Sequence, residues 1–177
     1  NLGRPGYRIQ RLLRDSAGTG PWVENGTYLV SPLSDQLEVV EDNLRFIKLH
    51  IPFALKFKWK GNRFISSDPY SSVYSFSNDD NMNDWEYSYD QFEATASIGG
   101  KTLNDVYTVT HIDESLNAPV TNTSSYGART FSAEKYAKNL GLVYRDYILW
   151  EYQPNTGGPG GGFKVGFGIK MWIIDNN

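Results

Sequence analysis

Two histidines, His50 and His111, are the only imidazoles available for acid–base chemistry in this sequence of 177 residues. His111 opens the segment His111-Ile112-Asp113-Glu114, where a neighbouring carboxylate would orient the ring. On a β-strand, His111 would share one face with Asp113 rather than Glu114, because successive side chains alternate. The sequence has no cysteine nucleophile and no serine in a Gly-x-Ser-x-Gly elbow. The pattern therefore favours a strand histidine hydrogen-bonded at the surface over a catalytic one.

A run of aspartate and asparagine follows in residues 77–84, and it is the best candidate for a metal site. Asp79, Asn81 and Asn83 repeat at intervals of two and offer side-chain oxygens, which calcium prefers. The EF-hand pattern is not matched, because Asp84 stands where that loop requires glycine. A turn rich in Asx residues between two strands is the simpler interpretation. Calcium is the only cofactor that the sequence suggests.

Glu86 and Asp90 are a candidate carboxylate pair for glycoside hydrolysis. If this segment is extended, both side chains lie on one face, about 13 Å apart at roughly 3.3 Å per residue. That separation exceeds what either glycosidase mechanism needs. A hydrolase acting on glycans or peptides is therefore an alternative and not the favoured function.

Aromatic residues are the more prominent feature, because they form two groups along the chain. Tyrosine and tryptophan combine an apolar ring with a polar tip and suit recognition surfaces. The same residues also fill the cores of small β-proteins, so both interpretations stay open. The candidate ligand-binding residues are Trp85, Tyr87, Tyr89, Trp150 and Tyr152.

The elements that must position these residues are mainly strands, because the dominant hydrophobic period is two. Residues 51–60 alternate apolar side chains with lysines and are followed by Gly61-Asn62, which is typical of a tight hairpin. Asp42-Asn43 and Gly99-Gly100 indicate two further hairpins. Residues 142–153 and 163–174 are predicted as the last two strands. The N-terminal residues 7–14 are also predicted as a strand.

One short helix is predicted near residues 132–140. Ser132 is suited to an N-cap, and Gly141 stands where a left-handed residue would end the helix. Consecutive hairpins then imply an antiparallel meander. We expect a mainly β fold, either a barrel-like or half-barrel sheet with this helix or, alternatively, a two-sheet β-sandwich. The chain is expected to form a single domain over residues 1–177, with residues 1–20 loosely attached.

The balance of acidic and basic residues indicates which classes of partner are expected. The formal net charge is −3, and basic residues gather only in the groups Arg4, Arg8, Arg11 and Arg14, and Lys56, Lys58, Lys60 and Arg63. A nucleic-acid-binding protein normally has a basic excess, so neither DNA nor RNA is an expected partner. No apolar run approaches the roughly 18 residues of a transmembrane helix, so no membrane span is expected.

A resemblance to a known family is carried by three segments of the C-terminal half. They are the Tyr-Ala-Lys-Asn-Leu-Gly-Leu-Val-Tyr-Arg run at residues 136–145, Gly166-Phe167-Gly168-Ile169, and Ile174-Asp175-Asn176. In these segments the chain resembles uncharacterised exported lipoproteins of Bacteroidetes-type bacteria. The resemblance implies a lipid-anchored periplasmic or surface protein with an antiparallel, calycin-like β fold. The lipid-bearing cysteine would lie upstream of residue 1, and no family catalytic residues carry over.

These observations together predict a non-enzymatic cell-envelope or secreted protein. It would bind a small molecule, a glycan or an envelope protein through an aromatic-lined surface or barrel mouth. A hydrolase and a structural or assembly subunit of the envelope are the alternatives.

Overall fold

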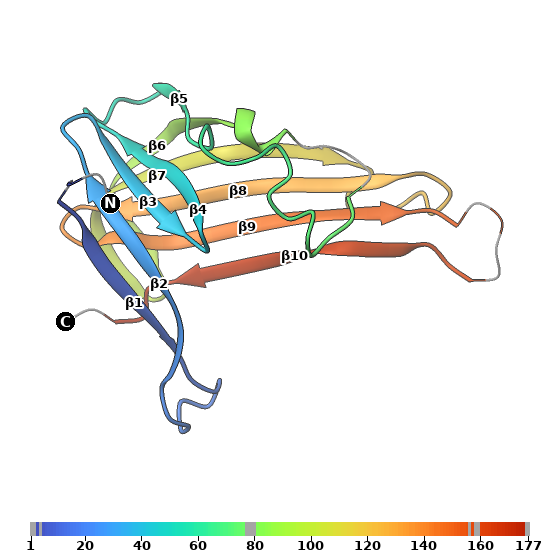
Figure 1. The fold of residues 1–177 in the computed structure, drawn as a ribbon, viewed down its shortest axis with the longest axis horizontal. Coiled ribbons are helices and arrows are strands. Elements are labelled where there is room, and N and C mark those ends of the chain that lie inside the picture. Colours follow the sequence, from blue (N-terminus) through green and yellow to red (C-terminus); the bar gives the residue numbers. More distant parts are fainter. Residues whose placement is uncertain (1–2, 4, 77–80, 156, 158–159, 176–177) are drawn as a thin grey trace.

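The computed structural model describes the chain except for residues 1–2, 4, 77–80, 156, 158–159 and 176–177. Its ten strands form two antiparallel sheets (Figure 1). The four-stranded sheet contains β1 (Tyr7–Leu13), β2 (Val23–Pro32), β3 (Gln36–Glu41) and β4 (Leu44–His50) in that order. The six-stranded sheet contains, in chain order, β5 (Lys58–Lys60), β6 (Glu86–Ile98), β7 (Lys101–Leu116), β8 (Gly127–Ala137), β9 (Gly141–Gln153) and β10 (Phe163–Trp172).

Each sheet is a meander, because neighbours in the sheet are also neighbours in the chain. The strands of the smaller sheet run at a steep angle to those of the larger sheet (Figure 1). Neither sheet closes on itself, since β1 and β4 end one sheet and β5 and β10 end the other. The expected mainly β antiparallel fold is thus confirmed, in its two-sheet or half-barrel form and not as a closed barrel.

The main core lies between the two sheets. Phe46 and Leu49 of β4 pack in the same buried cluster as Tyr87 and Tyr89 of β6 and Leu149 of β9. A smaller cluster, which includes Leu103, Val106 and Val143, lies beside the β6–β7 turn. The chain therefore buries its aromatic strands mainly by packing one sheet on the other.

The two hairpin turns that the sequence indicates most clearly are confirmed. Asp42 and Asn43 join β3 to β4 with φ angles of 50° and 63°. Gly99 and Gly100 join β6 to β7 with φ angles of 59° and 81°. Positive φ at both central positions is what a type I′ turn requires, and glycine and asparagine tolerate it best.

The predicted helix near residues 132–140 is wrong, because this segment continues β8 and then turns into β9. Ser132 pairs with Tyr147 and Glu134 pairs with Arg145 across the β8–β9 ladder. Asn139 and Gly141 have φ angles of 66° and 87° and make the tight turn between the strands. The signals that suggested a helix cap and stop belong to a strand and its hairpin turn. The strand is stabilised by hydrogen-bonding neighbours on both sides.

The predicted strand at residues 51–60 and the hairpin at Gly61-Asn62 are also wrong. Only Lys58–Lys60 pairs as a strand, and the Phe57 amide donates to the Ala54 carbonyl in a turn. Residue 61 is a glycine for a different reason: a Cβ there would lie 2.4 Å from the ring of Tyr87. In the described part of residues 61–85 the chain forms turns and the short 3-10 helix Met82–Asp84, with no strand. In the described part of the chain, no helix is long and apolar enough to cross a membrane.

Candidate functional site

A buried ionic cluster joins the two sheets. At its centre is Glu134 of β8, which is only 1% exposed. Its Oε1 accepts hydrogen bonds from Lys48 Nζ at 2.9 Å and from Arg145 Nε at 2.8 Å. Its Oε2 accepts a hydrogen bond from the Tyr136 hydroxyl at 2.5 Å. Because Lys48 belongs to β4, this carboxylate ties the larger sheet to the smaller one.

Arg145 makes the second connection between the sheets. Its guanidinium forms two hydrogen bonds with the carboxylate of Glu41, one of them from Nη2 to Oε2 at 2.8 Å. Glu41 ends β3, whereas Arg145 is in β9. The paired, fork-shaped geometry is the strong form of an ion pair. Two cations and two carboxylates thus balance each other inside the interface between the sheets.

These contacts fix the protonation states of the cluster. Burial alone would raise the pKa of Glu134, but the charges of Lys48 and Arg145 hold it well below its usual range. Burial would likewise raise the pKa of Glu41, and its hydrogen bond with Arg145 lowers it. Burial raises the pKa of Tyr136 well above 10, and the neighbouring Glu134 carboxylate adds to this effect. Both carboxylates are therefore charged and Tyr136 is neutral at neutral pH.

His111 lies beside this cluster and not at the surface, which corrects the prediction from the sequence. The ring is 3% exposed and stacks on Tyr87 with a centroid distance of 3.7 Å. Its Nδ1 is 2.8 Å from Ser132 Oγ, and its Nε2 is 3.5 Å from Glu134 Oε2. Asp113, the expected partner of His111, instead accepts a hydrogen bond from Arg129 at 2.5 Å. Burial lowers the pKa of His111 to about 4, so the ring is neutral at pH 7.

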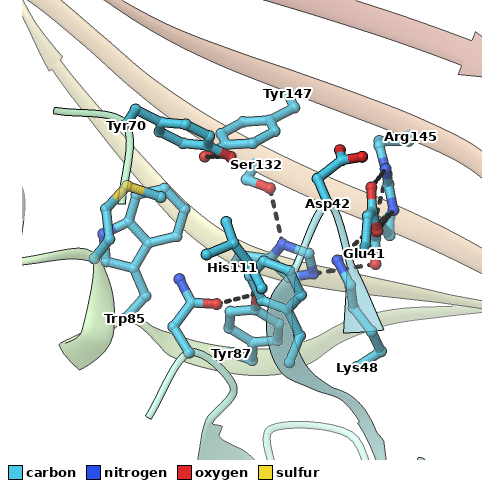
Figure 2. A pocket seen from close by; sticks show the side chains of 15 residues that line it. Glu41, Asp42, Lys48, Tyr70, Trp85, Tyr87, His111, Ser132, Arg145 and Tyr147 are labelled. Carbon is cyan, nitrogen blue, oxygen red and sulfur yellow. Dashed lines mark hydrogen bonds and ion pairs between the residues drawn. The ribbon is translucent and has the colours of Figure 1, made fainter. Parts of the chain in front are cut away.

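A small chamber lies between these groups and the turns of residues 61–85. Figure 2 shows His111, Ser132, Lys48 and Tyr87 around it, with Trp85 at one side. Its volume is about 60 Å³, and a water molecule needs roughly 10–15 Å³ measured in this way. The chamber has room for a few water-sized molecules and not for a sugar ring or a peptide. Ser132, His111 and Glu134 have the residue types of a hydrolytic triad, but the chamber beside them is too small for such a substrate.

A second and much larger cavity opens beside the ionic cluster, and we call it the aromatic cleft. Its volume is about 630 Å³. Phe53, Phe92 and Tyr107 form an aromatic wall, in which the Tyr107 ring is stacked on Phe53 at a centroid distance of 4.9 Å and tilted against Phe92 at 4.8 Å. The remaining lining residues are Leu49, Asp105, Tyr136, Ala137, Lys138, Asn139, Leu140 and Gly141.

The lining of the aromatic cleft comes from distant parts of the chain. Phe53 lies in the connection after β4, Phe92 in β6 and Tyr107 in β7. The turn between β8 and β9 supplies the polar side, where Lys138 Nζ lies 3.7 Å from a carboxylate oxygen of Asp105. Phe53 and Phe92 are 42% and 40% exposed, so the aromatic wall is accessible from solvent.

The aromatic residues that the sequence suggests for ligand binding are not gathered in this cleft. Trp85, Tyr87, Tyr89 and Tyr152 are all buried, with exposed fractions of 7% or less. Trp150 is half-buried, and Lys164 Nζ lies 4.1 Å from its ring centroid. The first three belong to the main core, which is the other interpretation that the sequence leaves open. They therefore form no exposed recognition surface.

The candidate calcium ligands are only partly described by the structure. Asp79 lies outside the described residues, while Asn81 and Asn83 are exposed and flank the start of the 3-10 helix. Among the described residues, no group of three or more histidine, aspartate or glutamate side chains is arranged to hold a metal ion. The carboxylates of the proposed hydrolytic pair are engaged separately, Glu86 with Lys58 and Asp90 with Ser88.

Sequence reasoning missed the residues that matter most in both cavities. Lys48, Glu134 and Arg145 attract no attention in the sequence, because each is one charged residue in an otherwise ordinary strand. Phe53 was expected on the buried face of a longer strand, and Phe92 and Tyr107 as ordinary strand residues. Comparison with known protein families, with curated proteins and with solved structures gives no match to this chain. The interpretation of both sites therefore rests on their geometry.

Proposed function

We propose that this protein binds a small, largely apolar molecule in the aromatic cleft and does not transform it. The observation that carries the proposal is the cleft itself, whose volume of about 630 Å³ falls in the roughly 300–1,000 Å³ range of small-molecule sites. Its lining is mainly apolar and aromatic, with Asp105, Lys138 and Asn139 as the polar groups that would orient a ligand.

The charges around the cleft support a ligand without a strong net charge. Lys138 and Asp105 are oppositely charged and only 3.7 Å apart, so they largely neutralise each other at the entrance. A ligand with an apolar body and a neutral or zwitterionic polar end fits this arrangement best. The aromatic faces of Phe53 and Tyr107 favour flat rings or extended hydrocarbon.

The positions of the reactive groups support the proposal of binding without catalysis. His111 and Glu134, whose pKa values are perturbed, line the small chamber and do not line the cleft. Tyr136 lines the cleft, but its hydroxyl already donates to Glu134. No pair of titratable groups suited to acid–base catalysis is described in the lining of the cleft, because its acid and its lysine pair with each other.

Titration followed by fluorescence tests this function with three probes that carry no net charge: indole, 2-naphthol and the zwitterion dodecylphosphocholine, whose binding is followed through the tryptophan emission of the protein. We expect saturable binding of at least one probe and a rise in melting temperature, since a ligand at one hundred times its Kd adds about 2.7 kcal/mol. Phe92→Ser should weaken that binding roughly ten-fold, because the aromatic wall loses one ring.

The matched control is Phe163→Ser, which removes an exposed phenylalanine outside the cleft lining. Binding to this control should equal binding to the unmodified protein. The proposal fails if none of the probes binds at millimolar concentration, or if the two substitutions weaken binding equally.

We further infer that the protein works in the cell envelope, as an exported and lipid-anchored protein. The support is the resemblance of residues 136–145 and of the last strand to exported lipoproteins. Fractionation of cells that express the gene with its natural upstream region tests this inference. Recovery with the envelope supports it, and recovery in the cytosol contradicts it.

A further inference from the structure

Strand β1 is an open edge of the four-stranded sheet. It pairs only with β2, and six of its seven residues are exposed. In Figure 1 the β1–β2 hairpin extends past the six-stranded sheet, and its tip lies away from the rest of the ribbon. One side of β1 therefore offers backbone N–H and C=O groups without a neighbouring strand.

The charge on this edge has one sign. Strand β1 contains Arg8 and Arg11 and no acidic residue, whereas the whole chain has 17 basic and 20 acidic residues. The edge is thus a basic element on a protein that is otherwise acidic. Such local asymmetry steers acidic partners toward the strand.

Among the described arginines of β1 and the residue after it, Arg8 has the least compensated charge. Arg11 is held by the Tyr28 hydroxyl and lies 3.8 Å from Asp42, and the guanidinium of Arg14 lies over the ring of Trp22. Arg8 is exposed and has no ion pair with a described residue. The nearest acidic residue of β2 in the register, Glu24, pairs with Leu12 at the other end of the strand.

The pattern along β1 suits one kind of partner. Tyr7 and Ile9 are 68% and 51% exposed and share one face, whereas Arg8 lies on the opposite face. A second copy of β1 in the register that places Arg8 opposite Arg8 would bring like charges together, which is destabilising. An incoming strand with acidic residues opposite Arg8 and apolar residues opposite Tyr7 and Ile9 would avoid this repulsion.

We propose that β1 is a docking edge for an extended acidic segment of a partner protein, which adds a fifth strand to the smaller sheet. Main-chain hydrogen bonds supply affinity in this mode, and the alternation of charge and apolar contacts supplies specificity. This surface is separate from the aromatic cleft, so it does not depend on the proposed ligand.

The experiment measures fluorescence anisotropy with a fluorescein-labelled peptide that alternates glutamate with valine. Two comparison peptides replace every glutamate by lysine or every valine by proline, since proline cannot donate a hydrogen bond to a strand. We expect only the glutamate–valine peptide to bind. Arg8→Glu should weaken its binding by roughly ten-fold, with an unchanged circular dichroism spectrum showing that the variant folds.

Lys56→Glu is the charge-matched control, because it makes the same change at an exposed lysine in the connection after β4. It should alter the affinity by less than about two-fold. Equal weakening by both variants, equal binding of the proline peptide, or equal competition by polyphosphate would show plain charge attraction and overturn the proposal. No binding of the glutamate–valine peptide at millimolar concentration would overturn it as well.

Discussion

The ionic cluster and the aromatic cleft meet at one residue and differ in almost every other respect. Tyr136 donates its hydroxyl to Glu134 of the cluster, while the same side chain lines the cleft. The chamber beside the cluster is lined by charged groups as well as aromatic ones and is about 60 Å³ in volume, whereas the cleft is mainly apolar and about 630 Å³ in volume. The charged groups of the cluster therefore line the small chamber, whereas the larger aromatic cleft has few charged groups.

This contrast separates groups that specify the fold from groups that bind. The charges of the cluster are already paired with each other, so little of their electrostatic potential remains for a ligand. They set the position of the smaller sheet on the larger one, because displacement would leave charges buried and unpaired. The aromatic side chains of the cleft retain accessible surface, so contact with a ligand would still remove apolar area from water.

The largest expected effect is the loss of stability in Glu134→Gln. This substitution keeps the shape of the side chain but removes the charge that balances Lys48 and part of that of Arg145. Breaking a buried pair in this way costs about 3–5 kcal/mol in free energy of unfolding, because the remaining charges stay buried without a partner. Urea denaturation measures the difference.

Glu93→Gln is the matched control for this prediction. Glu93 pairs with Lys135 at 2.8 Å, but both side chains are about a quarter exposed. Its removal should cost less than about 1 kcal/mol, as is typical of surface pairs. Similar losses of free energy of unfolding in the two variants would contradict the view that burial makes the ion pairs of the cluster important for stability.

Lowering the pH should reduce the free energy of unfolding by slightly less than Glu134→Gln does. The pKa of His111 is lowered to about 4 in the folded chain from an ordinary value of 6.5, so the unfolded chain binds this proton first as the pH falls. The free energy of unfolding should therefore decrease between pH 6.5 and 4, by about 3 kcal/mol for a shift of this size. The lowered pKa values of Glu41 and Glu134 act in the same direction below pH 4.5.

Thermal unfolding at pH values from 7.5 to 4 measures this effect. His111→Gln should flatten the upper part of the curve, between pH 6.5 and 5, where the carboxylates contribute little. His50→Gln removes the other imidazole and leaves the cluster intact, so it separates the loss of a histidine from the loss of His111. A steep loss above pH 5 that persists in His111→Gln would assign the acid sensitivity to another group.

Tyr136→Phe tests the residue that the two regions share. It removes one hydrogen bond to the buried carboxylate of Glu134, and a bond to a charged group contributes about 1.5–3 kcal/mol. We expect a loss of about 2 kcal/mol in free energy of unfolding, measured by urea denaturation. Because the ring remains in the cleft wall, the affinity for a probe of the cleft should stay within about two-fold. A large loss of binding would show that the two regions are coupled.

The parts of this fold that follow from the sequence are local. The turns at Asp42-Asn43 and Gly99-Gly100 need only positive φ angles. Aspartate, asparagine and glycine adopt such angles more easily than other residues, so these dipeptides predict the turns. The predicted helix failed because Ser132 and Glu134 are buried polar residues, which hide the alternation of a strand. Hydrophobic periodicity does not reveal a strand whose inward face is polar.

The sites themselves depend on contacts between distant segments. Lys48 and Glu134 are 86 residues apart, and Glu41 and Arg145 are 104 apart. Only the packing of one sheet on the other brings these charges together. The cleft is assembled from five strands, a connection and a turn, so no single segment of the sequence contains its aromatic wall as a motif.

Phe92→Ser should have the smallest effect on stability. In contrast to Tyr136→Phe, it should also change the affinity for a cleft probe. Because Phe92 is 40% exposed, its truncation removes only part of the buried area of a core phenylalanine, and the free energy of unfolding should fall by about 1–2 kcal/mol. Binding of a cleft probe should nevertheless weaken roughly ten-fold, because the ring that packs against Tyr107 in the cleft wall is lost. Urea denaturation and probe titration on the same preparations measure both quantities. If Phe92→Ser lost stability but kept binding, the division between a structural cluster and a binding cleft would be reversed.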